Sequence, residues 1–159
     1  MRGMYGFPWY GGKQGLAAWI LGHFPPHRVY VEPFGGSMAV LLAKPPSPVE
    51  VYNDIDGDLV TFFRVVRDPR LFRRLYRRLL LTPYSRQEYL EAQAPTADLV
   101  ERAARWYVRV CQGFSAQAGL GGWSYSVGTS HRGMAGAVSK WLGRLEGLPA
   151  LHHRLRRVQ

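Results

Sequence analysis

The stretch Val29-Tyr-Val-Glu-Pro-Phe-Gly-Gly-Ser-Met-Ala-Val-Leu-Leu42 decides the fold of this 159-residue chain. Its apolar start predicts a short strand over 29–32, and the apolar residues after Ser37 predict a helix over 37–43. The two glycines between them let the backbone approach a ligand closely, and the first N–H groups of the helix point outward. Such a turn forms a site for a small polar ligand, although it also occurs where a helix only packs on a sheet.

A second glycine turn lies upstream, in Phe7-Pro-Trp-Tyr-Gly-Gly-Lys13, just before an apolar helix predicted over 14–23. An aromatic face next to this turn suits a cationic group. A lysine beside it suits a carboxylate. The alternative is a surface hairpin with a stray lysine.

An acid-tipped strand lies downstream, where Val49-Glu-Val-Tyr-Asn-Asp54 predicts a strand over 49–53. Asp54 follows Gly36 by 18 positions. A carboxylate about 20 residues after a glycine turn lies at the tip of the next parallel strand, where it can accept hydrogen bonds from ribose hydroxyls. The competing interpretation is a helix cap, a role that we expect rather for Asp56 or Asp58.

These three segments, in this order and with this spacing over residues 7–60, resemble the Dam-like DNA adenine-N6 methyltransferases of the alpha group. The resemblance implies transfer of a methyl group from S-adenosylmethionine (SAM) to N6 of adenine at specific sites in duplex DNA. It further implies that Trp9 covers the cofactor, that Lys13 holds its carboxylate and that Asp54 is the cofactor acid. The implied SAM contacts are Trp9, Lys13, Glu32, Pro33, Phe34, Gly35, Gly36, Ser37 and Asp54.

The alternation of strands and helices predicts an α/β fold with a parallel sheet, because helices follow the strands at 37–43 and 57–67. Combined with the resemblance, we expect a partial Rossmann-like methyltransferase sheet with a mostly helical target-recognition insertion. Further helices are predicted at 69–81, after Ser85 as N-cap, at 96–111, at 135–145 and from Pro149 onward. We expect a SAM-binding half over 1–68, a DNA-binding target-recognition domain over 69–148 and a return segment over 149–159.

The predicted helix over 69–81 carries one arginine face and one apolar face. Its arginines repeat at spacings of three and four residues. Such a face either contacts DNA phosphates or is simply solvated, and the sequence leaves both interpretations open. The arginines are Arg70, Arg73, Arg74, Arg77 and Arg78.

Residues 112–133 are rich in glycine, serine and aromatic residues and show no helical period. A segment of this length without regular structure is usually functional or mobile. In the resembled family it belongs to the target-recognition domain, and its small polar and aromatic side chains suit base edges and phosphates. The alternative is a flexible surface loop. The implied DNA contacts are Gln112, Ser115, Trp123, Ser124, Tyr125, Ser126, His131 and Arg132.

The composition narrows the remaining classes of protein. A formal net charge of +10, carried mainly by arginine, fits a polyanionic partner such as DNA. We expect no metal site, because Cys111 is the single cysteine and the adjacent His152 and His153 would point about 100° apart on a helix. Apolar runs stay far below the ~20 residues of a membrane span, and no signal peptide is recognisable, which predicts a cytoplasmic protein.

The resembled enzymes hold the target amine through an Asp/Asn-Pro-Pro-Tyr/Phe motif, which these 159 residues do not contain. We therefore expect the N-terminal part of such an enzyme, with doubtful activity alone and a separate polypeptide as the possible carrier of the motif. The alternative is a non-catalytic SAM-sensing or DNA-binding module. Restriction-modification and other uses of DNA methylation fit this sequence equally well.

Overall fold

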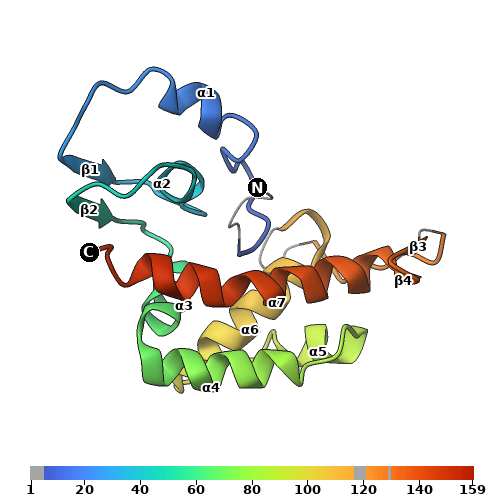
Figure 1. Ribbon diagram of the computed structural model, residues 1–159. Helices are drawn as coiled ribbons and strands as arrows, with labels where there is room; N and C mark the ends of the chain where they lie inside the picture. The colour runs from blue at the N-terminus through green and yellow to red at the C-terminus, as the bar shows by residue number, and fades with distance from the viewer. Residues whose placement is uncertain (1–5, 117–120, 129) are drawn as a thin grey trace.

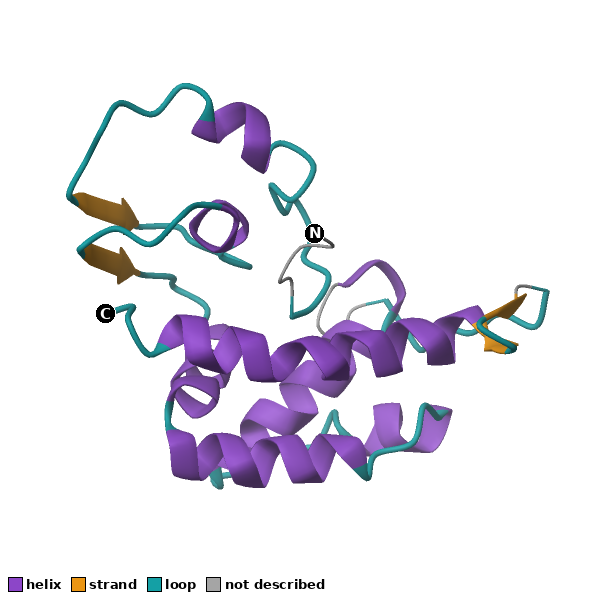
Figure 2. Ribbon diagram, in the orientation of Figure 1, coloured by secondary structure: helices purple, strands orange, loops and turns teal. Residues whose placement is uncertain are grey.

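The computed structural model of the chain describes residues 6–116, 121–128 and 130–159 (Figure 1). Within these residues the fold is mixed α/β, with seven α-helices and two small sheets (Figure 2). None of the helices formed by the described residues is both long and apolar enough to cross a bilayer. The elements in chain order are α1 (Ala17–Leu21), β1 (Val29–Glu32), α2 (Ala39–Ala43), β2 (Val49–Tyr52), α3 (Gly57–Arg67), α4 (Pro69–Leu80), α5 (Arg86–Glu91), α6 (Leu99–Gln112), the 3₁₀ helix η1 (Phe114–Ala116), β3 (Ser130–His131), β4 (Met134–Ala135) and α7 (Gly136–Leu155).

The predicted parallel strands are confirmed, because β1 and β2 pair in parallel with Val29 opposite Val49 and Glu32 opposite Tyr52. Helices α1 and α2 pack against each other and lie beside this pair of strands (Figure 1). Side chains of β1 alternate between exposed and half-buried. We refer to residues 6–54, which carry the sheet and both glycine turns, as the sheet half.

Helices α3 to α7 form the second part of the molecule, which we call the helical half. Its centre is aromatic: the ring of Phe62 packs 5.0 Å from Trp106 and 5.2 Å from Tyr107, centroid to centroid. The predicted caps are confirmed, since the side chain of Asp56 accepts hydrogen bonds at the start of α3 and that of Ser85 does so at the start of α5.

One helical prediction is wrong. Separate helices were expected over 135–145 and from Pro149, but α7 runs without a break from Gly136 to Leu155 with Pro149 inside it. A proline inside a helix removes one hydrogen bond and disfavours the preceding turn. Leucines on both sides of it, Leu145 and Leu151 among them, are at most 2% exposed, so burial of one continuous apolar stripe outweighs the local penalty.

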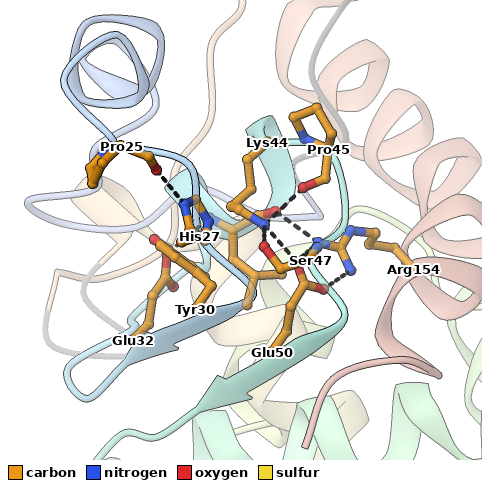
Figure 3. A network of polar contacts seen from close by, with 10 residues as sticks. Pro25, His27, Tyr30, Glu32, Lys44, Pro45, Ser47, Glu50 and Arg154 are labelled. Carbon is orange, nitrogen blue, oxygen red and sulfur yellow. Dashed lines mark hydrogen bonds and ion pairs between the residues drawn. The ribbon is translucent and has the colours of Figure 1, made fainter.

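A buried ion cluster joins the two halves (Figure 3). Arg154 of α7 donates to both carboxylate oxygens of Glu50 in β2, at 2.5 and 2.8 Å, and Lys44 donates to one of them at 2.8 Å. Burial by itself raises the pKa of Glu50, but the hydrogen bonds from Arg154 and Lys44 outweigh it and lower the pKa to about 2. The end of α7 is thereby fixed against the sheet.

Candidate functional site

The tip of β2 holds the glycine turn that follows β1. The amide of Gly35 donates to the carbonyl of Asn53 at 2.9 Å, and the amide of Gly36 donates to the carboxylate of Asp54 at 2.8 Å. The hydroxyl of Tyr52 donates to the carbonyl of Gly36 at 2.8 Å. These three hydrogen bonds with residues 52–54 give backbone groups of the turn their partners and so hold the turn in place.

Neither glycine of this turn leaves room for a side chain. A Cβ on Gly35 would lie 2.2 Å from the ring of Tyr52. A Cβ on Gly36, whose φ is +49°, would lie 2.8 Å from the indole nitrogen of Trp9. The glycines thus allow Tyr52 and Trp9 to approach the backbone closely.

A cleft of about 310 Å³ lies between this turn and the upstream Trp9–Lys13 turn. Its volume falls at the lower end of the range of small-molecule sites. The structure therefore brings together eight of the nine residues that the sequence predicts for the cofactor. They are Trp9, Lys13, Glu32, Pro33, Phe34, Gly35, Gly36 and Ser37.

Trp9 and Lys13 differ in how firmly they are held. Trp9 is half-buried and packs 6.0 Å from Phe7 and 6.1 Å from Trp106, ring centroid to ring centroid. Lys13 is exposed, and its ammonium donates to the carbonyl of Gly11 at 2.7 Å. The aromatic wall of the cleft is therefore anchored in the helical core, while the cation sits on the rim.

The two carboxylate oxygens of Glu32, a residue that lines the cleft, are used differently. Its Oε1 atom accepts hydrogen bonds from the Tyr30 hydroxyl at 2.7 Å and from the Leu41 amide at 2.8 Å. Its Oε2 atom is buried and has no hydrogen-bond partner among the described residues. Burial raises the pKa of Glu32. A buried acceptor without a donor is costly, so this atom is suited to an amine or hydroxyl of a ligand.

Asp54, the ninth predicted residue, faces a different hollow. Its two oxygens accept the amides of Gly36 and Asp56, at 2.8 and 3.0 Å, so it connects the glycine turn to the start of α3. It also lines a hollow of about 350 Å³ that lies beyond the glycine turn. Arg64 and Arg67, in the last turn of α3, line the same hollow.

Two apolar side chains project from the loops after the strands. Phe34 follows β1 and is 90% exposed, and Ile55 follows β2 and is 97% exposed. Large apolar side chains at the carboxyl ends of parallel strands are placed where ligands of open α/β sheets bind. They offer apolar surface for a flat ring.

The sequence interpretation missed Met38 and Tyr52. Met38 is buried and has a φ of +56°, a left-handed conformation that is uncommon without glycine, and it lines the Asp54 hollow. No sequence signal indicates that conformation in methionine. Tyr52 could have been found, because it immediately precedes the acid-tipped end of the strand.

The predicted DNA-contact segment begins with a buried residue. Gln112 is 0% exposed; its amide nitrogen donates to the carbonyl of Pro83 and its amide oxygen accepts the Ser85 amide. These bonds hold the start of the segment against the loop before α5. Residues 117–120 and 129 of the segment lie outside the described residues.

The exposed part of the segment displays an aromatic pair. Tyr125 is 68% exposed and stacks on Trp123 at 5.4 Å between centroids. The hydroxyl of Tyr84 donates to the carbonyl of Ser124, and the Tyr84 ring packs 5.8 Å from that of Trp123. Ser126, whose side chain is half-buried, lies next to Tyr125 in the chain.

The three other predicted contact residues are exposed as well. Ser115 lies in η1 with a φ of +60°. His131 and Arg132 lie at the β3–β4 turn, where His131 Nδ1 is 3.1 Å from the Ser139 hydroxyl and Arg132 pairs with Glu146 at 3.7 Å. Apart from Gln112, the predicted DNA contacts that the structure describes are therefore wholly or partly open to solvent.

Comparison with known families identifies the chain. The family model for D12 class N6 adenine-specific DNA methyltransferases matches residues 9–116, which include the cleft, the Asp54 strand and helices α3 to α6. No curated protein matches the chain. The chain belongs to the D12 class N6 adenine-specific DNA methyltransferase family, as the resemblance predicted.

Proposed function

We propose that this member of the adenine-N6 DNA methyltransferase family binds SAM in the cleft between the two glycine turns. The observation that carries the proposal is the buried Glu32 Oε2 atom, an acceptor without a partner in the described residues, in the wall of a cleft of about 310 Å³. SAM carries an amine and ribose hydroxyls that can satisfy it. SAM, when bound, supplies the electrophilic methyl group.

The residues of the cleft suit the parts of this cofactor. Trp9 offers an aromatic face to a cationic centre. Lys13, on the rim, can pair with a carboxylate. Asp54 holds the Gly36 amide through the 2.8 Å hydrogen bond. It also lines the neighbouring hollow, where its carboxylate can accept further hydrogen bonds. Exposed Phe34 offers apolar surface for the adenine ring.

We propose that the two parallel strands belong to a Rossmann-like methyltransferase sheet. Support comes from the edge of β2 that does not face β1. There the Gln159 amide donates to the Glu50 carbonyl and the Gln159 carbonyl accepts from the Tyr52 amide, both at 2.9 Å. This is the bonding pattern of a parallel bridge. Further support is that Val29 and Val31 are 57% and 50% exposed, because both faces of such sheets are normally covered.

We also propose a division of the chain into three parts. Residues 1–68 would form the SAM-binding part, 69–148 the target-recognition part and 149–159 the return segment. The cleft residues all precede Asp68, which supports the first boundary. Helix α3 also precedes it but packs against α6 and α7, and so connects the two parts.

Duplex DNA is the proposed substrate, as the family implies. The stacked pair of Trp123 and Tyr125 offers a surface on which an unpaired base can stack. Arg132, on the exposed turn after β3, is suited to phosphates or to a guanine edge. Gln112 supports this segment from within, because its amide is already bonded to backbone.

The chemical step also needs groups that hold the target amine, and the 159 residues contain no Asp/Asn-Pro-Pro-Tyr/Phe motif. We propose that methyl transfer to unmethylated duplex DNA requires this motif in addition to the 159 residues. The competing function, a non-catalytic SAM-sensing or DNA-binding module, is favoured by the same missing motif and predicts no transfer even when the motif is supplied.

Calorimetric titration of SAM into the protein and two variants tests the cofactor site. Asp54→Ala should lower the affinity at least about tenfold, because the charged bond that holds Gly36 is lost. Asp56→Ala is the matched control: it removes a nearby cap, costs about 1 kcal/mol of stability and should leave affinity unchanged. Equal affinity of Asp54→Ala and the unmodified protein would refute the assignment.

A further inference from the structure

Helix α4 carries five arginines in twelve residues and no acidic residue. Its apolar side is used internally, because Phe72, Leu75 and Leu79 are buried in the helical core. The arginines therefore lie on the remaining surface of the helix. No residue of α4 lines the cleft between the two glycine turns.

Two of the five arginines have structural partners. Arg74 pairs with Asp98 at 3.4 Å, and Arg78 pairs with Glu101 at 3.3 Å and with Glu88 at 3.7 Å. These ion pairs connect α4 to the starts of α5 and α6. They account for one side of the arginine face and leave the other side unexplained.

The other three arginines form a row that we call the α4 arginine row: Arg70, Arg73 and Arg77. All three are exposed, and none forms an ion pair with a described carboxylate. The nearest acid in the chain, Asp68, uses its carboxylate to cap the helix at the amides of Arg70 and Leu71. Because like charges three or four residues apart destabilise a helix, the row has no evident structural benefit.

The row lies far from the candidate cofactor cleft. Helix α4 packs against α3, α6 and α7, and these helices separate it from the two-stranded sheet (Figure 1). Figure 2 shows the same arrangement, with α4 along the lower edge of the helical half and the strands above it. No α4 residue lines the glycine-turn cleft, so a phosphate bound by this row lies outside that cleft.

We propose that the α4 arginine row binds the phosphate backbone of duplex DNA beyond the segment that holds the target base. The inference rests on the proposed DNA-directed function and adds a second, sequence-independent contact surface to it. From Arg70 to Arg77 the helix rises about 10 Å, the length occupied by about three phosphates of one strand. Guanidinium groups bind phosphate oxygens with paired N–H donors.

An anionic membrane surface is the other polyanion that such a helix could meet. A helix that lies in a membrane interface inserts its apolar face among the lipids. The apolar face of α4 is covered by α3, α6 and α7, and only Leu80 and Leu81 at its end are exposed. The observations therefore favour nucleic acid.

The test is the salt dependence of binding to a fluorescent duplex of mixed sequence, measured by anisotropy. The variant R70Q/R73Q/R77Q should reduce the slope of log affinity against log salt by about 2.7, since each phosphate contact contributes about 0.9. R70K/R73K/R77K should keep most of the slope because it keeps the charge. A thermal melt should show the glutamine variant as stable as the unmodified protein or more so, because repulsion along the row is removed.

R86Q/R156Q/R157Q is the matched control, since it removes three exposed arginines from outside α4. If the slope falls equally in this control, the effect depends only on net charge, and the inference is overturned. An unchanged slope in R70Q/R73Q/R77Q would overturn it too, while leaving the proposed function intact. Absence of DNA binding by the unmodified protein would overturn both, and tighter binding to phosphatidylserine vesicles than to DNA would point to the membrane instead.

Discussion

The two halves of the molecule are stabilised in different ways. The helical half has an aromatic centre in which Phe62, Trp106 and Tyr107 are at most 1% exposed. The sheet half has two four-residue strands, and hydrogen bonds between a strand tip and a glycine turn organise its cleft. The difference leads us to propose that the helical half supplies stability and that the sheet half supplies the cofactor site.

Several contacts connect these parts, and two of them make the comparison testable. Trp9 of the cleft packs on Trp106 of the helical core, and Glu50 of β2 is held by Arg154 of α7. A substitution in the helical half should therefore change stability first. A substitution at the cleft should change cofactor affinity first.

The largest effect is expected at Phe62, which is 0% exposed. Phe62→Ala should lower the free energy of unfolding by about 4 kcal/mol, because it opens a cavity among stacked rings. Urea denaturation followed by circular dichroism measures it. A loss below about 1 kcal/mol would mean that the aromatic centre does not carry the stability of the fold.

The next effect is expected at the ion cluster. Glu50→Gln leaves Arg154 and Lys44 without their buried carboxylate and should cost about 3 kcal/mol of unfolding free energy. Replacement of the whole cluster by apolar residues of similar volume need not cost stability. The single substitution is the informative one, because it leaves buried charges without their partner.

The same carboxylate gives stability a pH dependence. The pKa of Glu50 is lowered from 4.5 to about 2 in the folded chain, so its contribution is present above pH 4.5 and is lost as the pH falls toward 2. The unfolding free energy of the unmodified protein should decrease across this window, whereas Glu50→Gln should lack that part of the decrease. An equal decrease of the unfolding free energy in both proteins across this pH window would contradict the account.

A smaller effect is expected at the glycine turn. Gly36→Ala places a side chain at a φ of +49° and 2.8 Å from the Trp9 indole, and should cost about 1–2 kcal/mol of stability. It should also weaken SAM binding, because Trp9 must shift. Gly122→Ala is the matched control, since its φ is +74° but its Cβ would meet nothing within 4 Å. Equal SAM affinities of both variants would show that Trp9 does not line the site.

The smallest effect on stability is expected at Phe34, which is 90% exposed. Phe34→Ala should change the unfolding free energy by less than about 0.5 kcal/mol. SAM affinity should nevertheless fall about tenfold, a loss of about 1.4 kcal/mol, if the ring covers the cofactor adenine. Chemical denaturation and calorimetry on the same sample separate the two quantities.

Much of the fold could be predicted from local sequence signals. The strands over 29–32 and 49–53, the caps at Asp56 and Ser85, and the amphipathic helices depend on patterns of neighbouring residues. The continuous α7 could not be predicted, because its helical state at Pro149 depends on burial of leucines against distant segments. Local penalties are outweighed where tertiary packing is strong.

The cleft was predictable because most of its residues lie in two short stretches of this chain, from Trp9 to Lys13 and from Glu32 to Ser37. Two features of the site depend on tertiary structure and were not predictable. One is the buried Glu32 Oε2 atom without a partner, and the other is the burial of Gln112 beneath the predicted DNA-contact segment. Exposure of a polar side chain cannot be read from its neighbours in sequence.

The most direct test of the central claim is amide NMR of the ¹⁵N-labelled protein during titration with SAM. The account predicts shifts at Gly35, Gly36 and Gly12, whose backbone lines the cleft, and none at Arg73 in α4. Shifts confined to the helical half, or no shifts at saturating SAM, would contradict the claim that the glycine-turn cleft is the cofactor site.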